Sequence, residues 1–463
     1  MPICIFWTPL SSSLHPPFNV GSSAFADDEF LISDSQTKLQ ALLGIVEYYG
    51  RMYKVTYGAN KTKITVVGSD QDMKYYSDTM PWHIDEMKVK VCEDNDHLGQ
   101  IVSGIRQEQK NVDLRISKGR NNLFGMLGPA FSFKCLLSPK VKVHLFRTYT
   151  CPIIRSGLSS FSLRTSDLQP LAVFHRKILR GILNLSKCAS NPAIHFLLGE
   201  LPIEAKIHRD IFSLFYNVWL NPDSKIYKIV KYLLETSPDN SRTWSIHLRH
   251  LCQKYELKDP LKCLESDPPS KSSYKTDVNI RIQTYHEKTL RIQAENNSVM
   301  QYLNTSLYGL NGRCHPALAN LVTSHQVKKA RIHLKMLAGN FLTYEMKSNQ
   351  SGGSSHCRCC VPPSPSENLE HIISVCNAYS DIRKRMIVEY TILCSMAKSS
   401  ISWPDIVSDK NTFCQFVLDP ASFNLIQRIN INDPILGSLF EVSRDFCFAI
   451  NTTRQRILGS LPK

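Results

Sequence analysis

Two groups of residues in this 463-residue chain have types and spacing that suit a metal ion. The first is the acidic pair Asp27-Asp28, which lies between two short apolar runs, so we expect a hairpin with both carboxylates at its tip. Neighbouring carboxylates repel each other and therefore attract a divalent cation, and Mg²⁺ prefers oxygen ligands. Two such ions can stabilise the attacking and leaving oxygens of phosphoryl transfer. A solvated turn remains the simpler explanation of an isolated Asp-Asp pair.

The second group is the set Cys357, Cys360, His371 and Cys376, whose spacing is Cys-x2-Cys-x10-His-x4-Cys. Zinc prefers four tetrahedral ligands, and thiolate sulfur and imidazole nitrogen are the usual ones. The spacing therefore predicts a structural Zn²⁺ site. Cys359 could replace Cys360 as a ligand, although the Cys-x2-Cys spacing favours Cys360. A thiol-rich loop beside a buried histidine is the alternative that requires no metal.

Three short motifs follow one another in the first hundred residues. Phe25-Ala26-Asp27-Asp28 resembles the active-site hairpin of reverse transcriptases, and Asn60-Lys61-Thr62-Lys63 resembles the Asn-x-x-Lys turn of the same family. His97-Leu98-Gly99 is similar to the family's primer-grip hairpin. Their order and spacing resemble those of non-LTR (long interspersed) retrotransposon polymerases. Segments 115–120, 196–202 and 329–335 and the zinc knuckle also resemble downstream regions of that family.

The resemblance implies a function and roles for individual residues. It implies RNA-templated DNA synthesis that depends on Mg²⁺, with a primer–template duplex of RNA and DNA as partner and no small-molecule cofactor. Asp27 would be a catalytic metal ligand with Asp28 beside it. Lys61 would lie near the incoming nucleotide, with Lys63 as a companion. His97, Leu98 and Gly99 would position the primer end.

The family's polymerase site also needs a third carboxylate from an earlier palm strand. Residues 1–26 contain no Asp or Glu, and the fingers that hold template and nucleotide are not recognisable. Positioning and charge stabilisation supply most of the catalysis in phosphoryl transfer. We therefore expect a truncated polymerase that is inactive alone. The alternatives are a non-catalytic RNA- or DNA-binding protein and a decayed transposon reading frame.

The charge balance is consistent with a polyanionic partner. The chain has 55 Lys and Arg against 40 Asp and Glu, a net charge of +15. Clusters of cations neutralise phosphates and release counterions, although a solvated face explains any single cluster. The candidate nucleic-acid contacts come from two clusters, Arg115, Lys118 and Arg120, and Lys328, Lys329, Arg331 and Lys335.

Composition excludes several other classes of protein. The 43% of hydrophobic residues argues against wholesale disorder, and no apolar run is long enough for a membrane span. We find no secretory signal, so the 15 cysteines are expected to be thiols or metal ligands in an intracellular protein, nuclear or cytoplasmic.

The pattern of elements predicts an α+β fold. We expect a partial palm with a short antiparallel sheet, in which Ser35 caps a helix with Leu39, Leu43 and Val46 on one face, then a helical thumb and a zinc knuckle. The predicted parts are a foreign or unstructured segment (1–19), the palm (20–104), the helical thumb and connection (105–264), a linker (265–277), a basic helical region (278–346), the knuckle (347–386) and a helical tail (387–463).

Overall fold

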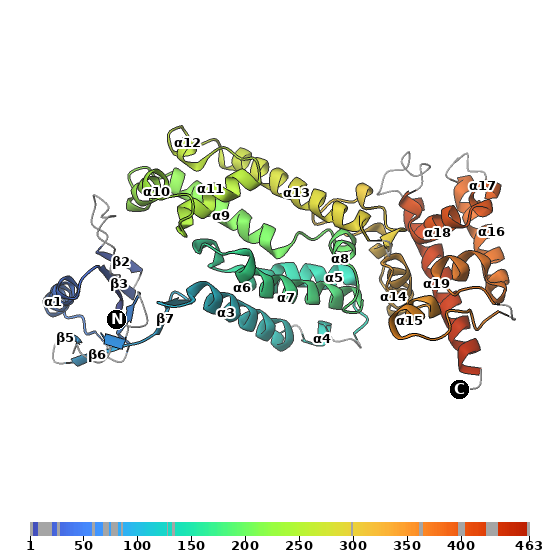
Figure 1. Ribbon diagram of the computed structural model, residues 1–463, viewed down its shortest axis with the longest axis horizontal. Coiled ribbons are helices and arrows are strands. Elements are labelled where there is room, and N and C mark those ends of the chain that lie inside the picture. The colour runs from blue at the N-terminus through green and yellow to red at the C-terminus, as the bar shows by residue number, and fades with distance from the viewer. Residues whose placement is uncertain are drawn as a thin grey trace. The chain divides into compact units, whose positions relative to one another are not determined.

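The computed structural model describes most of the chain, and it has the predicted α+β character (Figure 1). The described residues are 3–7, 21–25, 28–57, 61–67, 74–75, 82–84, 87–126, 128–131, 135–297, 300–360, 364–396, 403–422 and 434–460. The chain divides into two compact units. The first comprises Met1–Ser117, Arg155–Leu171 and Ile207–Val278, and the second comprises Lys118–Ile154, Ala172–Lys206 and Asn279–Lys463.

A six-stranded sheet in the order β2-β3-β1-β4-β6-β5 forms the start of the first unit. β2 and β3 are antiparallel, whereas β1 is parallel to both β3 and β4, and β4 is parallel to β6. The helix α1 connects β3 to β4, and a helical crossover of this kind places strands parallel. The strands are β1 (Ile3–Trp7), β2 (Ser22–Phe25), β3 (Asp28–Ser33), β4 (Lys63–Val66), β5 (Trp82–Ile84) and β6 (Met87–Val91).

Two expectations about this region are wrong. Residues 1–19 were expected to be unstructured, but Ile3–Trp7 form β1 in the middle of the sheet. The sheet was expected to be antiparallel, and it is mixed. Both differences have one cause, because β1 pairs on both edges and is parallel to both of its neighbours, β3 and β4. Within 1–19, the structure describes only the residues of this strand.

The core of this region lies between α1 (Gln36–Tyr53) and the sheet. Ser35 caps the helix as predicted, because its hydroxyl accepts a hydrogen bond from the Lys38 backbone N–H. Leu39, Leu43 and Val46 recur at helical spacing and are buried against strand residues. Those strand residues are Leu31, Ile64, Val66, Trp82, Ile84 and Val89.

A separate two-stranded hairpin and several helices complete the first unit. The indole of Trp219 donates to the Ser266 carbonyl, and the Tyr216 hydroxyl donates to the Pro269 carbonyl. The prediction of a linker at 265–277 is therefore wrong. These two bonds hold the first half of the segment against α9, and Lys271 is already the first residue of α13. The further elements are β7 (Asp94–His97), β8 (Gln100–Ser103), η3 (Leu158–Ser160), α10 (Lys225–Thr236), α11 (Trp244–Lys254) and α12 (Pro260–Leu264). Residues of α3 (Gln107–Asn121), α6 (Cys151–Arg155), α7 (Thr165–Leu183), α9 (Ile203–Trp219) and α13 (Lys271–Glu295) belong partly to each unit.

The second unit is helical, and α19 (Pro434–Ser460) is its central C-terminal element (Figure 1, red). α14 (Ser324–Leu337) and α16 (Ser380–Met396) both pack against α19. The predicted helical tail is helical, but its last helix contributes buried Phe440 and Ile450 to the core. The other elements are η1 (Asn122–Met126), α4 (Gly128–Phe131), α5 (Pro139–Leu145), η2 (Phe146–Thr150), α8 (Asn191–Leu198), η5 (Thr305–Leu307), η6 (Pro316–Leu318), α15 (Tyr344–Ser351), η7 (His371–Val375), η8 (Asn377–Tyr379), α17 (Trp403–Ser408), α18 (Lys410–Leu418) and η9 (Pro420–Ser422).

Across the described residues, no helix has both the length and the apolar character that a bilayer crossing requires.

A glycine at the end of α8 allows two distant segments to approach closely. Gly199 has φ +59°, and a Cβ added there would lie 2.0 Å from the Arg313 carbonyl oxygen. The Gly312 N–H donates to the Gly199 carbonyl at 2.8 Å, and the His315 N–H donates to the Leu197 carbonyl at 2.9 Å. The loop that contains Gly312 and Arg313 is thereby fixed on the end of α8.

Replacement of this glycine tests the close approach. We expect Gly199→Ala to destabilise the second unit by about 2 kcal/mol or more, because it adds left-handed strain and a steric clash. Gly181→Ala in α7 is the matched control, since a Cβ there meets nothing within 4 Å, and we expect it to be neutral or stabilising. The thermal unfolding midpoint measures both, and equal midpoints for the two variants would contradict the packing described.

Two buried histidines make the stability of the second unit depend on pH. Burial lowers the pKa of both His195 and His333 to about 3, and the His333 Nδ1 is buried without a hydrogen-bond partner. Both imidazoles are neutral when folded but return to a pKa of about 6.5 on unfolding, so the unfolded chain binds more protons. Stability is complete above about pH 6.5 and falls as the pH decreases towards 3. We expect the thermal midpoint to decrease over this range, and less steeply in His333→Asn. A variant as steep as the wild type would contradict this assignment.

Candidate metal centre and paired hairpins

The four predicted zinc ligands converge in the second unit. One ligand atom from each of Cys357, Cys360, His371 and Cys376 lies within 4.8 Å of the other three. The Cys360 Sγ is 3.5 Å from the Cys376 Sγ and 3.5 Å from the His371 Nε2, and the Cys357 Sγ is 4.0 Å from the Cys376 Sγ. Tetrahedral bonds of about 2.3 Å to one ion place sulfur atoms about 3.5–4 Å apart. The prediction of convergence is confirmed, and the cluster can hold a metal ion such as zinc.

Local hydrogen bonds place the first two cysteines. The Cys357 N–H donates to the Pro365 carbonyl at 2.9 Å, and the Glu367 N–H donates to the Ser355 carbonyl at 2.8 Å. These antiparallel contacts, with the isolated bridge between His356 and Ser366, close the loop that contains Cys360. The Cys-x2-Cys turn is therefore held from both sides of the loop.

A capped helical turn places the other two ligands. The Asn368 side chain accepts a hydrogen bond from the His371 N–H at 2.8 Å, which starts the short π-helical turn η7. The Cys376 N–H donates to the His371 carbonyl at 2.8 Å, and this bond fixes the backbone of the second ligand relative to the first. The Arg383 guanidinium then donates to the Cys376 carbonyl at 2.7 Å. Both ligands are buried, and burial lowers the pKa of His371, which keeps its imidazole in the neutral, metal-binding form.

Cys359 and Cys360 differ in their neighbours, because Cys360 groups with Cys357, His371 and Cys376, whereas Cys359 groups with Cys357 and Glu367. The Cys359 Sγ accepts a hydrogen bond from the Tyr379 hydroxyl at 3.3 Å, and Cys359 is not a member of the four-residue cluster. Cys360 completes the Cys₃His set, as its spacing predicted.

A buried ion pair connects the metal loop to two helices. Glu367 has 0% exposure, and its carboxylate accepts hydrogen bonds from the Arg454 guanidinium at 2.5 Å and from the Tyr344 N–H at 3.0 Å. The Arg454 guanidinium also lies 5.5 Å from the centre of the Tyr344 ring. A buried carboxylate needs such partners, so the loop, α15 and α19 are coupled. Neither residue could be assigned this role from its position in the sequence.

The two predicted hairpins, one with the acidic pair and one with His97-Leu98-Gly99, are present in the first unit. β2 pairs with β3 so that Phe25 faces Asp28, which makes Asp28 the first residue of β3. Asp27 lies outside the described residues. β7 pairs with β8 through a turn at Leu98 and Gly99, which have φ of +48° and +74°. This turn confirms that His97-Leu98-Gly99 forms a hairpin.

The hairpins meet through Phe30 and His97. The centres of these two rings are 5.0 Å apart. Burial lowers the pKa of His97, whereas the charge of the Asp28 carboxylate acts to raise it. The structure therefore brings β3, which begins at Asp28, against His97 of the second hairpin through the Phe30 ring. Lys61 is exposed and Lys63 is the half-buried first residue of β4.

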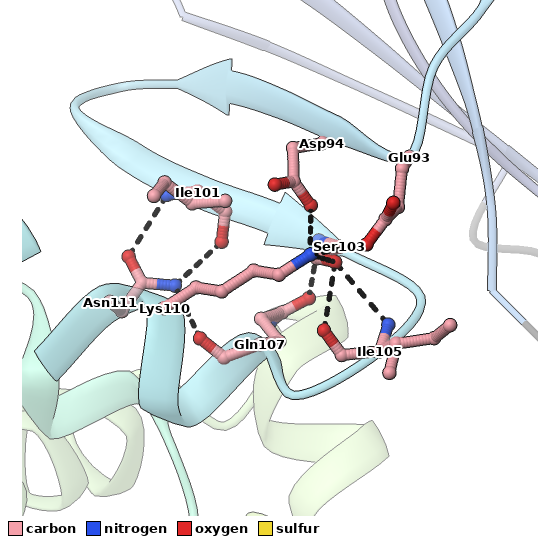
Figure 2. A network of polar contacts seen from close by, with 8 residues as sticks. All are labelled: Glu93, Asp94, Ile101, Ser103, Ile105, Gln107, Lys110 and Asn111. Atoms are coloured by element: carbon pink, nitrogen blue, oxygen red, sulfur yellow. Dashed lines mark hydrogen bonds and ion pairs between the residues drawn. The ribbon is translucent and has the colours of Figure 1, made fainter. Parts of the chain in front are cut away.

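The β7–β8 hairpin is fastened to α3 by polar side chains (Figure 2). The Asn111 amide accepts from the Ile101 N–H at 2.9 Å and donates to the Ile101 carbonyl at 2.6 Å, as a neighbouring strand would. The Lys110 ammonium contacts Asp94 at 2.6 Å and Glu93 at 2.7 Å. The edge of β8 is thus paired by a side chain. No sequence pattern identified Asn111, because its partner is a backbone.

Three of the predicted nucleic-acid contacts have other roles. Arg115 is only 5% exposed and donates to the Gly99 carbonyl at 2.7 Å, so it supports the hairpin turn. Lys329 pairs with Asp445 at 2.7 Å, and Arg331 donates to the Cys135 carbonyl at 2.7 Å. A cation that is engaged by a protein carbonyl or carboxylate offers less of its charge to a phosphate, and the nucleic-acid role of these three residues stays a prediction. The remaining candidates are Lys118, Arg120 and Lys328, which are exposed, and Lys335, which is half-buried.

Comparison with protein-family models and with curated proteins gives no match to this chain.

Removal of single cysteines tests the metal centre. We expect purified protein to contain one Zn²⁺ per chain, and Cys360→Ser to lose most of it, because three ligands bind far more weakly than four. Cys359→Ser is the matched control, because Cys359 is the neighbouring residue in the chain but is not one of the four clustered residues. It should keep the metal. Elemental analysis and the visible spectrum of the Co²⁺-substituted protein measure both. Metal loss in Cys359→Ser with retention in Cys360→Ser would contradict the ligand set.

Proposed function

We propose that this chain is a C-terminal portion of a non-LTR retrotransposon reverse transcriptase that binds a primer–template duplex of RNA and DNA. The observation on which the proposal depends is the contact between Phe30 and His97, whose ring centres are 5.0 Å apart. The first belongs to the Asp-Asp hairpin and the second to the hairpin that resembles a primer grip.

The chemistry explains why this proximity supports the proposal. A polymerase joins the primer hydroxyl to a nucleotide phosphate, so the primer end must lie within a few ångströms of the catalytic ions. The Asp27-Asp28 carboxylates would hold Mg²⁺, and His97 to Gly99 would hold the primer. The Gly99 carbonyl is also anchored by Arg115, which would give a primer contact a rigid base.

The metal centre has a structural role in this proposal. Zn²⁺ bound by Cys357, Cys360, His371 and Cys376 would neutralise thiolates that otherwise repel one another and would order the loop beside α15 and α19. The Arg358 guanidinium, next to the first ligand, lies 5.2 Å from the centre of the Tyr344 ring. A cation and an aromatic ring next to a zinc knuckle are suited to contact single-stranded bases.

A non-catalytic nucleic-acid-binding protein is the second candidate. Lys118, Arg120 and Lys328 are exposed and would bind phosphates whether or not polymerisation occurs. The reaction also uses a third carboxylate, and residues 1–26 contain none. The two candidates therefore differ in catalysis and agree in binding.

Duplex binding across a range of salt concentrations tests both candidates. We expect a recessed RNA–DNA primer–template to bind with an affinity that falls linearly with salt on logarithmic axes. Lys118→Gln/Arg120→Gln should reduce that slope by about 1.8, from two contacts at about 0.9 each. Lys225→Gln/Lys228→Gln on α10 removes the same charge from exposed positions and should change the slope less. Fluorescence anisotropy measures the affinity, and undetectable binding by the wild type would leave a decayed reading frame.

Primer extension in Mg²⁺ separates the two candidates. We expect no incorporation by the 463-residue polypeptide alone, because two carboxylates from one hairpin cannot surround two ions. Incorporation that is lost in Asp27→Asn would assign a working polymerase site to this hairpin and would contradict that expectation.

A further inference from the structure

The second unit contains a cavity of about 710 Å³ that lies outside the metal centre and the hairpins. Its wall is formed by α5 and η2 on one side and by the segment 307–320 on the other, and the start of α19 closes it. Pockets of this volume hold ligands of nucleotide size and not the cross-section of a duplex.

The wall is rigid because the segment 307–320 is fixed at several points. The Gly312 N–H bonds the Gly199 carbonyl, and the Cys314 thiol lies 3.7 Å from the Leu198 carbonyl oxygen. The Arg147 guanidinium donates to the Gly312 carbonyl at 2.7 Å and to the Leu198 carbonyl at 2.8 Å. A ligand that enters the cavity therefore meets a wall that is already ordered, which lowers the entropic cost of binding.

The charge of the lining has one sign. It contains three cations and two histidines and no carboxylate: Lys140, His144, Arg147, Arg313 and His315. The carboxylates behind the wall are already paired. Glu200 is 2% exposed and is held by Arg147 at 2.6 Å and by Lys206, and Asp419 accepts from the Tyr308 hydroxyl at 2.8 Å. Glu200 is thus neutralised by two cations, whereas Asp419 lies behind the lining residue His315, whose Nε2 is 3.5 Å from its carboxylate.

Three of the lining side chains are placed to bind. Lys140, His144 and Arg313 are exposed, whereas Arg147 is occupied by Glu200 and by the two carbonyls. An exposed cation loses less hydration energy than a buried one when it meets a phosphate, and Arg binds phosphate through two parallel donors. Lys140 belongs to α5 and Arg313 to the facing segment 307–320, and both line the cavity.

The remainder of the lining is suited to a sugar and a base. Val143, Leu307 and Leu436 supply apolar surface, and Asn311 and Asn320 supply amide groups that can donate and accept hydrogen bonds. A simple inorganic anion would not contact these apolar and amide groups.

We propose that this cavity binds the phosphate and adjoining nucleoside of a single nucleic-acid strand, with Lys140 and Arg313 as the phosphate contacts. The proposal rests on the proposed function in one respect, because the phosphate belongs to a strand of the bound nucleic acid. It adds a second binding site, for a strand outside the duplex. Arg147 is a positioning residue, since it holds the Gly312 carbonyl and the Leu198 carbonyl in place.

The test measures binding of a short single-stranded RNA, and of a DNA of the same sequence, to the full chain. We expect Lys140→Gln/Arg313→Gln to weaken binding of both strands about tenfold and to reduce the salt slope by about 1.4, from two contacts at about 0.7 each. Lys187→Gln/Lys384→Gln is the matched control, because both residues are exposed in the second unit and neither lines the cavity. Thermal unfolding of each variant identifies any loss of fold.

A second readout locates the strand directly. A strand that contains 4-thiouridine should crosslink to peptides from 139–147 or 307–320 in the wild type, and the crosslink should be lost in Lys140→Gln/Arg313→Gln. A nucleoside monophosphate competes only if the cavity takes a free phosphate, and inability of millimolar monophosphate to compete assigns the site to a strand.

Two results would overturn the proposal in distinguishable ways. Equal effects of the cavity variant and the control, with duplex binding intact, would contradict the cavity and leave the proposed function standing. No binding of any strand or duplex by the wild type would contradict both.

Discussion

Buried charges must find partners, and in the second unit this constraint joins segments that are far apart in the chain. Glu200, Glu367 and Asp419 are almost fully buried, and each is satisfied by groups from another part of the sequence. An unpaired carboxylate in the interior costs several kcal/mol, so each pair fixes one arrangement of the chain. Glu367 thereby holds the metal loop against α15 and α19, and Glu200 holds the side of the cavity through Arg147.

In the first unit, side chains of α3 satisfy backbone groups of the β7–β8 hairpin. The hairpin β7–β8 has only two strands, and a hairpin by itself is marginally stable. Asn111 supplies the missing neighbour by bonding both backbone groups of Ile101, and Arg115 satisfies the Gly99 carbonyl at the turn. The cost is that Arg115 offers less of its charge to a ligand. A positive side chain near a turn is therefore as much a structural support as a binding group.

Features that depend on residues close together in the chain could be predicted from the sequence, whereas features that depend on distant residues could not. The Ser35 cap, the helix with Leu39 and Leu43, and the hairpin turn at Leu98-Gly99 depend on neighbouring residues, and they were predicted correctly. The parallel pairing of β1 and the hydrogen bond from Arg331 to the Cys135 carbonyl depend on residues far apart in the chain, and they were not predicted. A short apolar run has the same pattern as a strand or as a disordered segment, so its partners decide which it becomes.

The metal centre separates the two contributions most clearly. Spacing alone determined that Cys357, Cys360, His371 and Cys376 can reach one ion, because a tight turn and a helical turn bring such ligands together locally. Spacing could not exclude Cys359, which differs from Cys360 by one position. Only the folded chain distinguishes them, because the Cys360 Sγ lies 3.5 Å from both the Cys376 Sγ and the His371 Nε2, whereas the Cys359 thiol accepts a hydrogen bond from the Tyr379 hydroxyl and groups with Cys357 and Glu367. Sequence determines which groups are available at a site, whereas the packing of distant side chains determines where each one points.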